Sequence, residues 1–200
     1  DGIDGMNHQA FSLILGKATQ AFDMKREDPR VVAKYGGGLG QSLLTARRLC
    51  EVGCGFVAVS LQGWDMHGNV AGGMNGRGPQ VDRAVSAFVS DIHQRGLDKN
   101  ILLVISGEFG RTPRINKNAG RDHWGPLSTL ALAGGGLNMG QVVGKSSPKA
   151  EVPAGGKVGP QELMATVFHV LGIERETSFD DPAGRPIPML GTGQPIKGLI

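Results

Sequence analysis

The apolar residues of this chain follow two patterns, one typical of buried strands and one typical of amphipathic helices. Three continuous apolar runs of strand length lie at residues 56–61, 101–106 and 128–135. Elsewhere apolar residues recur every three or four positions, a spacing that predicts helices. These predicted helices span residues 8–24, 41–52, 79–95 and 160–171.

Proline and glycine residues mark the expected ends of these helices. Pro79 and Pro160 suit a first helical turn, where a backbone N–H has no partner within the helix. Gly53, Gly96 and Gly172 follow the last apolar positions, and glycine readily adopts the left-handed conformation that ends a helix. We therefore expect the third helix to begin at Pro79 and the last to begin at Pro160.

The order of these elements predicts an α/β fold. The run 56–61, the helix 79–95 and the run 101–106 form a strand–helix–strand unit whose crossover is long enough to join parallel strands. A strand as apolar as 101–106 is expected to be covered on both faces. The prediction is a mostly parallel sheet with helices on both faces, followed by a short hairpin near residues 140–154 and an ordered loop or edge strand at the C-terminal end.

Composition and charge exclude several classes of protein. The net charge is only +3 and the basic residues are dispersed, which is not the footprint of a nucleic-acid-binding protein. No apolar run approaches the roughly 18 residues of a membrane-spanning helix. Cys50 and Cys54 are the only two cysteines, too few for a disulfide framework or a four-thiolate zinc site, so we expect free, buried thiols.

Candidate metal ligands follow two of the predicted strands. Asp65 and His67 come after the first strand, and Glu108, Asp122 and His123 come after the second. Ligands of open parallel sheets bind at the carboxyl ends of the strands, so these side chains are expected to converge. Carboxylates and imidazoles form a nitrogen and oxygen ligand set that suits zinc, manganese or iron. A purely structural interpretation stays open, because each Asp–His pair can also be a hydrogen-bonded loop pair.

Two arginines lie between the candidate ligands. Arg111 and Arg114 carry forked cations that match the oxygens of phosphate, sulfate or carboxylate groups. Next to a metal ion they would bind an anionic ester, whose hydrolysis a metal ion promotes. The other interpretation is that they form salt bridges with Glu108 and Asp122 to hold the loop. His93 and His169, in the predicted helices, are expected to be packing or surface residues, and nothing is inferred for His8 near the start of the chain.

Several motifs resemble one known family. They are "GWDMHGN", "GEFGRTPRIN", "GRDHWGP", "AGGGL" with "GQVVG", and the closing "ELMATVFHVLGI" with "GRPIPML". Together they resemble the bacterial family called domain of unknown function 1501, over essentially the whole chain. Members of that family look like divergent relatives of the alkaline phosphatase and sulfatase superfamily.

The resemblance implies a two-metal hydrolase fold like that of alkaline phosphatase. Asp65, His67 and His123 match the ligands of one divalent metal ion, for which zinc is the leading candidate and manganese, iron and calcium are the others. The second site of the superfamily uses an Asp–His pair where this chain has Glu108 followed by Phe109. Glu108 is kept as a metal ligand, but a differently formed second site is implied.

The resemblance also implies what lies outside these residues. The superfamily's nucleophile comes from a first strand and helix, and this chain begins at Asp1 without an initiating methionine. We expect residues 1–200 to be the C-terminal portion of one larger domain with little activity of its own. Members of the family usually carry export signals, so a periplasmic or extracellular location is expected.

The sequence therefore favours a metal-dependent hydrolase of phosphate or sulfate esters, whose substrate is an anionic small molecule or glycan ester. The alternative is a non-catalytic protein that binds an acidic glycan or a protein partner through the same loops. A third possibility is that the charged cluster is a structural ion-pair network.

Overall fold

The computed structural model describes residues 18–200, which divide into two compact units. Unit 1 ends at Leu97, and unit 2 comprises Asp98–Ile200. Most of the predicted helix 8–24 lies outside the described residues. Its last turn is helical, as the short α2.

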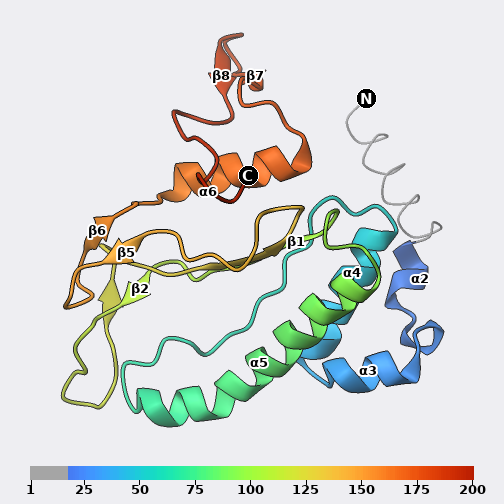
Figure 1. The fold of residues 1–200 in the computed structure, drawn as a ribbon, viewed down its shortest axis with the longest axis horizontal. Coiled ribbons are helices and arrows are strands. Elements are labelled where there is room, and N and C mark those ends of the chain that lie inside the picture. Colours follow the sequence, from blue (N-terminus) through green and yellow to red (C-terminus); the bar gives the residue numbers. More distant parts are fainter. Residues whose placement is uncertain (1–17) are drawn as a thin grey trace. The chain divides into compact units, whose positions relative to one another are not determined.

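The described part of unit 1 consists of helices joined by short turns and one long extended segment (Figure 1). The longest helix, α5, packs against α3 and α4, and α4 also contacts α2. Leu44 and Ile92, on α4 and α5, are almost completely buried. The elements are α2 (Ala18–Phe22), η1 (Met24–Arg26), α3 (Pro29–Tyr35), α4 (Leu39–Glu51) and α5 (Val70–Gln94).

Both predicted glycine caps in unit 1 are confirmed. Gly53 follows α4 with φ of 100°, and the N–H of Cys54 donates to the carbonyl of Leu49, which closes the helix end. Gly96 follows α5 with φ of 67°, and the N–H of Leu97 donates to the carbonyl of Ile92 at 2.7 Å. Local sequence therefore determined where both helices end.

The start of α5 differs from the prediction. The helix begins at Val70, where the side chain of Asn69 accepts a hydrogen bond from the N–H of Gly72 at 3.2 Å. Pro79 lies inside the helix, although an internal proline removes one backbone hydrogen bond and costs about 3 kcal/mol. Packing of α5 against two other helices offsets this cost, and the nine residues before Pro79 are helical rather than a loop.

The predicted parallel sheet is wrong. Among residues 18–200, every sheet is a pair of antiparallel strands, and all four pairs lie in unit 2. The pairs are β1 (Leu102–Ile105) with β4 (Ala131–Gly134), β2 (Gly110–Arg111) with β3 (His123–Trp124), β5 (Lys145–Ser146) with β6 (Pro153–Gly155), and β7 (Ser178–Asp180) with β8 (Pro186–Pro188).

Two segments account for this correction. Residues 56–61 form no strand, and Phe56 is 80% exposed, although the run is as apolar as a buried strand. The second apolar run does form β1, but its partner is β4, which returns after the 107–125 segment and therefore runs antiparallel. Val104 on β1 is 37% exposed, so β1 is not covered on both faces. An apolar run predicts extended backbone, but it does not specify the partner or the direction.

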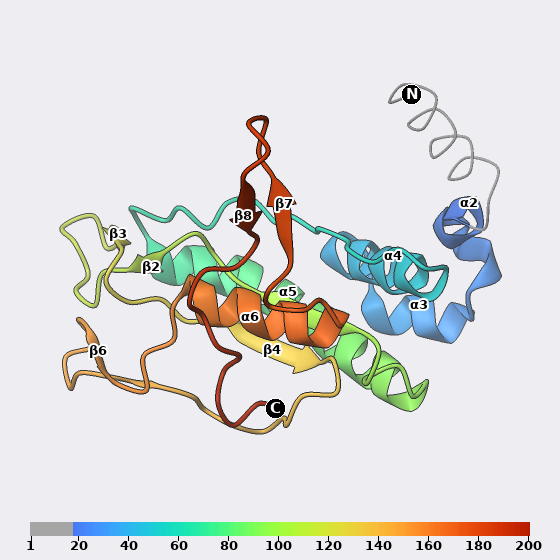
Figure 2. The ribbon, with the colours of Figure 1, turned by 90° about the horizontal axis from the view of Figure 1, so that it is seen from above.

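The last helix and the C-terminal end agree with the sequence. α6 (Pro160–Leu171) begins at the expected proline and ends at Gly172, which has φ of 67°. Its Val170 packs against the buried cluster of Leu137, Ile196 and Leu199, as do Leu102 and Leu132 of the β1–β4 pair, so α6 lies against this small sheet (Figure 2). The tail is ordered and adds buried side chains to the same cluster, at Ile196 and Leu199. The predicted hairpin is the β5–β6 pair.

Unit 1 also contains a buried ion network that the sequence did not predict. Its centre is Arg47 on α4, only 1% exposed, which forms ion pairs with Glu27, Glu51 and Asp91. Arg47 Nε lies 3.1 Å from Asp91 Oδ2 without the geometry of a hydrogen bond. Arg95 of the α5 end contacts Glu27 at 2.8 Å and Asp91 at 2.7 Å. Arg48 also pairs with Glu27, at 3.1 Å, and the Tyr35 hydroxyl donates a hydrogen bond to Asp91 at 2.9 Å.

The arginines and carboxylates of this network carry opposite charges, and the directions of the pKa shifts agree with this pairing. Burial alone would raise the pKa of Glu27, but hydrogen bonds and charges of Arg47, Arg48 and Arg95 lower it below its usual range. Burial raises the pKa of Tyr35, and the charge of Asp91 raises it further. Glu27 is therefore ionised at neutral pH, whereas Tyr35 is a neutral hydrogen-bond donor. The network therefore serves to hold α4, the end of α5 and the turn before α3 together.

Candidate metal centre

Asp65 and His67 form a close pair in unit 1. His67 Nε2 lies 2.9 Å from Asp65 Oδ1, and the two side chains are 46% and 62% exposed. The backbone reaches this arrangement through two tight turns, in which Met66 N–H donates to Trp64 and His67 N–H donates to Asp65. The two residues are two positions apart, a spacing that favours side chains on the same side of the backbone, and the contact agrees with it.

The start of α5 holds this loop in place. A Cβ atom on Gly63, where φ is 92°, would lie 2.3 Å from Arg77 Nη2, so the Arg77 guanidinium lies directly over Gly63. A Cβ atom on Gly73 would lie 2.1 Å from the sulfur of Met66. The loop that carries Asp65 and His67 is thus packed against the first two turns of α5. Sequence reasoning missed these contacts because it treated residues 70–78 as a loop.

The 107–125 segment of unit 2 is a long β-hairpin. Its strands β2 and β3 pair Gly110 with Trp124 and Arg111 with His123 (Figure 2). At the tip, Asn116 Oδ1 accepts hydrogen bonds from the N–H groups of Asn118 and Gly120, both at 2.9 Å. These bonds form the tight turn that brings His123 back beside Arg111.

Phe109 contacts the candidate ligand His123. The two ring centroids lie 4.3 Å apart with the planes tilted by 43°. The Arg111 guanidinium carbon lies 5.6 Å from the Phe109 centroid, within cation–π distance. Gly110 between them is required, because a Cβ atom there would lie 1.8 Å from the carbonyl oxygen of Leu127. Phe109, at the position of the expected second-site histidine, thus packs against the imidazole of His123.

The other predicted residues of the hairpin have different surroundings. Glu108 is exposed just before β2, and Arg114 is exposed at the turn, where its carbonyl accepts a hydrogen bond from Thr112 Oγ1. Asp122 Oδ1 accepts a hydrogen bond from Asn116 Nδ2 at 3.0 Å. Arg121 donates to the backbone carbonyls of Thr112 and Pro113, so it stabilises the hairpin.

Asp65, His67 and His123 are the residues that the resemblance predicts as ligands of one metal ion. Each is exposed and offers one ligand atom, a carboxylate oxygen or an imidazole nitrogen. Asp65 and His67 come from unit 1, and His123 comes from unit 2. In unit 1 the loop that carries Asp65 and His67 packs against α5. In unit 2 the ring of Phe109 packs against the imidazole of His123.

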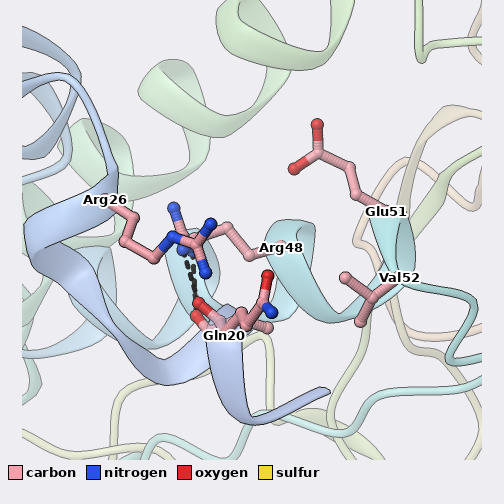
Figure 3. Close-up of a pocket in the computed structure, with 6 residues that line it drawn as sticks. Gln20, Arg26, Arg48, Glu51 and Val52 are labelled. Carbon is pink, nitrogen blue, oxygen red and sulfur yellow. Dashed lines mark hydrogen bonds between the residues drawn. The ribbon is translucent and has the colours of Figure 1, made fainter. Parts of the chain in front are cut away.

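A pocket of about 200 Å³ in unit 1 is a weaker candidate for a site (Figure 3). Its main cation, Arg48, donates hydrogen bonds to the carbonyls of Gln20, Ala21 and Asp23 and forms an ion pair with Glu27. A guanidinium with this many protein partners has little capacity left for a ligand. Arg48 therefore fixes α2 and the following turn onto α4.

The two cysteines are a less favourable place for a metal ion. Both are free, as expected, although they are half-buried rather than fully buried. Burial raises the pKa of Cys50, and the nearby Cys54 and Glu51 raise it further. Metals bind the thiolate, so a raised pKa disfavours binding. Separately, none of the helices within residues 18–200 is long and apolar enough to cross a membrane.

Comparison with known proteins identifies a family but no characterised relative. No curated protein and no solved structure matches the chain. One family model, described as "Protein of unknown function (DUF1501)", matches residues 5–200, which is nearly the whole chain. The chain therefore belongs to the DUF1501 family.

Proposed function

We propose that this DUF1501 protein is a metal-dependent hydrolase of phosphate or sulfate esters, and that Asp65, His67 and His123 bind its metal ion. The observation that carries the proposal is the Asp65–His67 contact of 2.9 Å. Two ligand atoms of one tetrahedral zinc ion lie about 3.3 Å apart, as bonds of roughly 2.0–2.1 Å require. The pair therefore needs only a small adjustment to share an ion.

The chemistry of the ligand set favours zinc. One carboxylate and two imidazoles are typical of catalytic zinc sites, which keep one coordination position open. Manganese, iron and calcium are the other candidates. A metal ion in this position would polarise an ester and activate a nucleophile. Glu108, exposed before β2, is proposed to lie in or beside a second metal site.

Two arginines of the hairpin are proposed to bind the anionic group of the ester. Arg111 is held by its strand pairing with His123 and by its position near the Phe109 ring, and Arg114 is exposed at the turn. Their guanidinium groups match phosphate and sulfate oxygens. The resemblance to the alkaline phosphatase and sulfatase superfamily supports the same substrate class. A glycan ester or an anionic small molecule fits it, and we propose that the protein is exported.

Elemental analysis of purified protein tests the ligand assignment. We expect about one equivalent of metal for the wild type and less than about a tenth for His67→Ala and His123→Ala, since each loses a ligand. His169→Ala, which removes an exposed histidine of α6, is the matched control and should keep its metal. Equal metal content in all four proteins would refute the assignment. Aryl phosphate and aryl sulfate assays on the full-length form then test the reaction.

A second candidate function is non-catalytic binding of an acidic glycan or a protein partner. The contact between Phe109 and His123 favours it, because an aromatic ring stands where the superfamily places a second-site ligand. This function predicts binding to a sulfated polysaccharide that persists in the presence of a chelator and is lost in Arg111→Ala. Binding that disappears on chelation would instead support the metal-dependent function.

A further inference from the structure

We propose that Arg77 of α5 is an anion-binding residue of the candidate metal centre, which contacts the oxyanion of a ligand held at Asp65 and His67. This inference rests on the proposed function and extends it to a residue outside the hairpin. It follows from where α5 begins, because helical residues before Pro79 are what bring Arg77 to the loop.

Arg77 is held at the base of the metal-ligand loop. Its Nη2, Nε and Cζ atoms would lie 2.3, 2.8 and 2.9 Å from a Cβ atom on Gly63, so the whole guanidinium group covers the glycine backbone. Gly63 precedes Asp65 by two residues, which span at most about 7 Å of chain. The guanidinium group therefore lies over the chain two residues before the candidate ligand Asp65.

The other well-placed arginines of unit 1 have protein partners. Arg47 and Arg95 pair with buried carboxylates, and Arg48 binds carbonyls of the α2 region. Arg83, six residues after Arg77 on the same helix, donates to the carbonyls of Ala33 and Lys34. These four side chains hold the helices together.

Arg77 differs from them. Within residues 18–200, no carboxylate pairs with its guanidinium and no carbonyl accepts a hydrogen bond from it. The side chain is half-buried, and its contact with Gly63 limits its motion. A guanidinium that is held in place but keeps its donors is suited to bind two oxygens of a phosphate or sulfate group.

Glycine at position 63 supports this role. Any larger residue would displace the guanidinium, because its Cβ atom would overlap Arg77 Nη2. The positive φ of Gly63 also disfavours other residues. Gly63 therefore both permits the turn and leaves space for the cation over its own backbone, two residues before Asp65.

Calorimetric titration of the zinc-loaded protein with inorganic phosphate tests the proposal. We expect Arg77→Gln to weaken phosphate binding about 10- to 100-fold, the usual effect of losing charge-assisted hydrogen bonds. Arg77→Lys keeps the charge and should recover part of the affinity. Zinc content should stay at the wild-type value in both variants. Lys25→Gln removes one exposed positive charge from the same unit and should bind phosphate as the wild type does.

The outcomes separate this inference from the proposed function. Phosphate binding that is absent in the wild type, or equally strong in Arg77→Gln, would overturn the role of Arg77. A wild type that binds no zinc would overturn the proposed metal centre. If the zinc-free wild type binds phosphate and Arg77→Gln does not, the anion site stands without the metal. Equal losses in Arg77→Gln and Lys25→Gln would reduce the effect to net charge and contradict the proposal.

Discussion

Two groups of ionisable residues in this molecule differ in burial. The buried ion network of unit 1 places Arg47, 1% exposed, between carboxylates that match its charge. The candidate metal ligands Asp65, His67 and His123 are all exposed. Charges enclosed by partners serve the fold, because their interactions are complete. Exposed carboxylate and imidazole groups on supported loops keep the capacity to bind a ligand.

This difference leads to opposite expectations for substitution. Removing one member of a buried ion network leaves an uncompensated charge in a poorly solvated position, which is strongly destabilising. Removing an exposed ligand should change metal binding with little effect on the free energy of unfolding of the metal-free protein. A third possibility, that the exposed residues are themselves a structural network, predicts the first outcome for both groups.

The largest expected effect on stability is that of Arg47→Met. The substitution leaves Glu27 and Asp91 with fewer cationic partners in the interior of unit 1, so we expect a loss of about 3–5 kcal/mol in the free energy of unfolding. Urea unfolding followed by circular dichroism measures it. The matched control is Arg30→Gln, since Arg30 pairs with Asp28 at 2.8 Å but is 88% exposed. Similar urea midpoints for Arg47→Met and Arg30→Gln would show that the buried ion pairs contribute no more to stability than the exposed pair.

A smaller effect is expected on acidification. The pKa of Glu27 is lower in the folded protein than in the unfolded chain, where it is about 4.3, so the unfolded state takes up more protons. The stabilisation is therefore complete above roughly pH 4.3 and is lost as the pH falls through the folded-state pKa. Urea midpoints between pH 7 and pH 3 should fall less steeply for Glu27→Gln than for the wild type. Urea midpoints that fall equally with pH in both proteins would contradict a stabilising role of ionised Glu27.

Among effects on the candidate metal centre, that of Phe109→Leu is expected to be modest. The aromatic contact with His123 is worth about 0.5–1.5 kcal/mol, so its loss should weaken metal binding about 2- to 10-fold. Phe109→Tyr keeps the ring and should bind metal as the wild type does. Competition with a chromophoric chelator measures these affinities. An unchanged affinity in Phe109→Leu would show that the ring does not position His123.

Features that depend on neighbouring residues were predictable from the sequence. α6 begins at Pro160 and ends at Gly172 as expected, because both signals act within one helical turn. The caps at Gly53 and Gly96 are correct for the same reason. The contact of Asp65 with His67 also follows from local spacing.

Features that depend on distant partners were not predictable. Residues 56–61 have the composition of a buried strand, yet strand formation requires a pairing partner that composition does not specify. Pro79 indicated a helix start, but Asn69 provides an earlier cap. The contact of Phe109 with His123 depends on the β2–β3 pairing, which the two-residue strands do not reveal in the sequence.

The buried ion network could have been predicted from the sequence. Arg47 follows Leu43 by four residues and Leu44 by three, which places it on the apolar face of α4. Asp91 lies beside Ile92 and three residues after Phe88, on the apolar face of α5. Opposite charges on the apolar faces of two successive helices predict a buried pair. This pair was not predicted because charged residues in helices are usually exposed.

X-ray absorption spectroscopy at the zinc edge tests the central claim most directly, because it reports which atoms surround the metal. For the zinc-loaded wild type we predict nitrogen and oxygen ligands at about 2.0–2.1 Å, with the multiple scattering of two imidazoles. His67→Ala and His123→Ala should each remove the two-imidazole signal. A sulfur shell at about 2.3 Å, which would indicate Cys50 or Cys54, would contradict the assignment. So would a wild-type spectrum with a single imidazole.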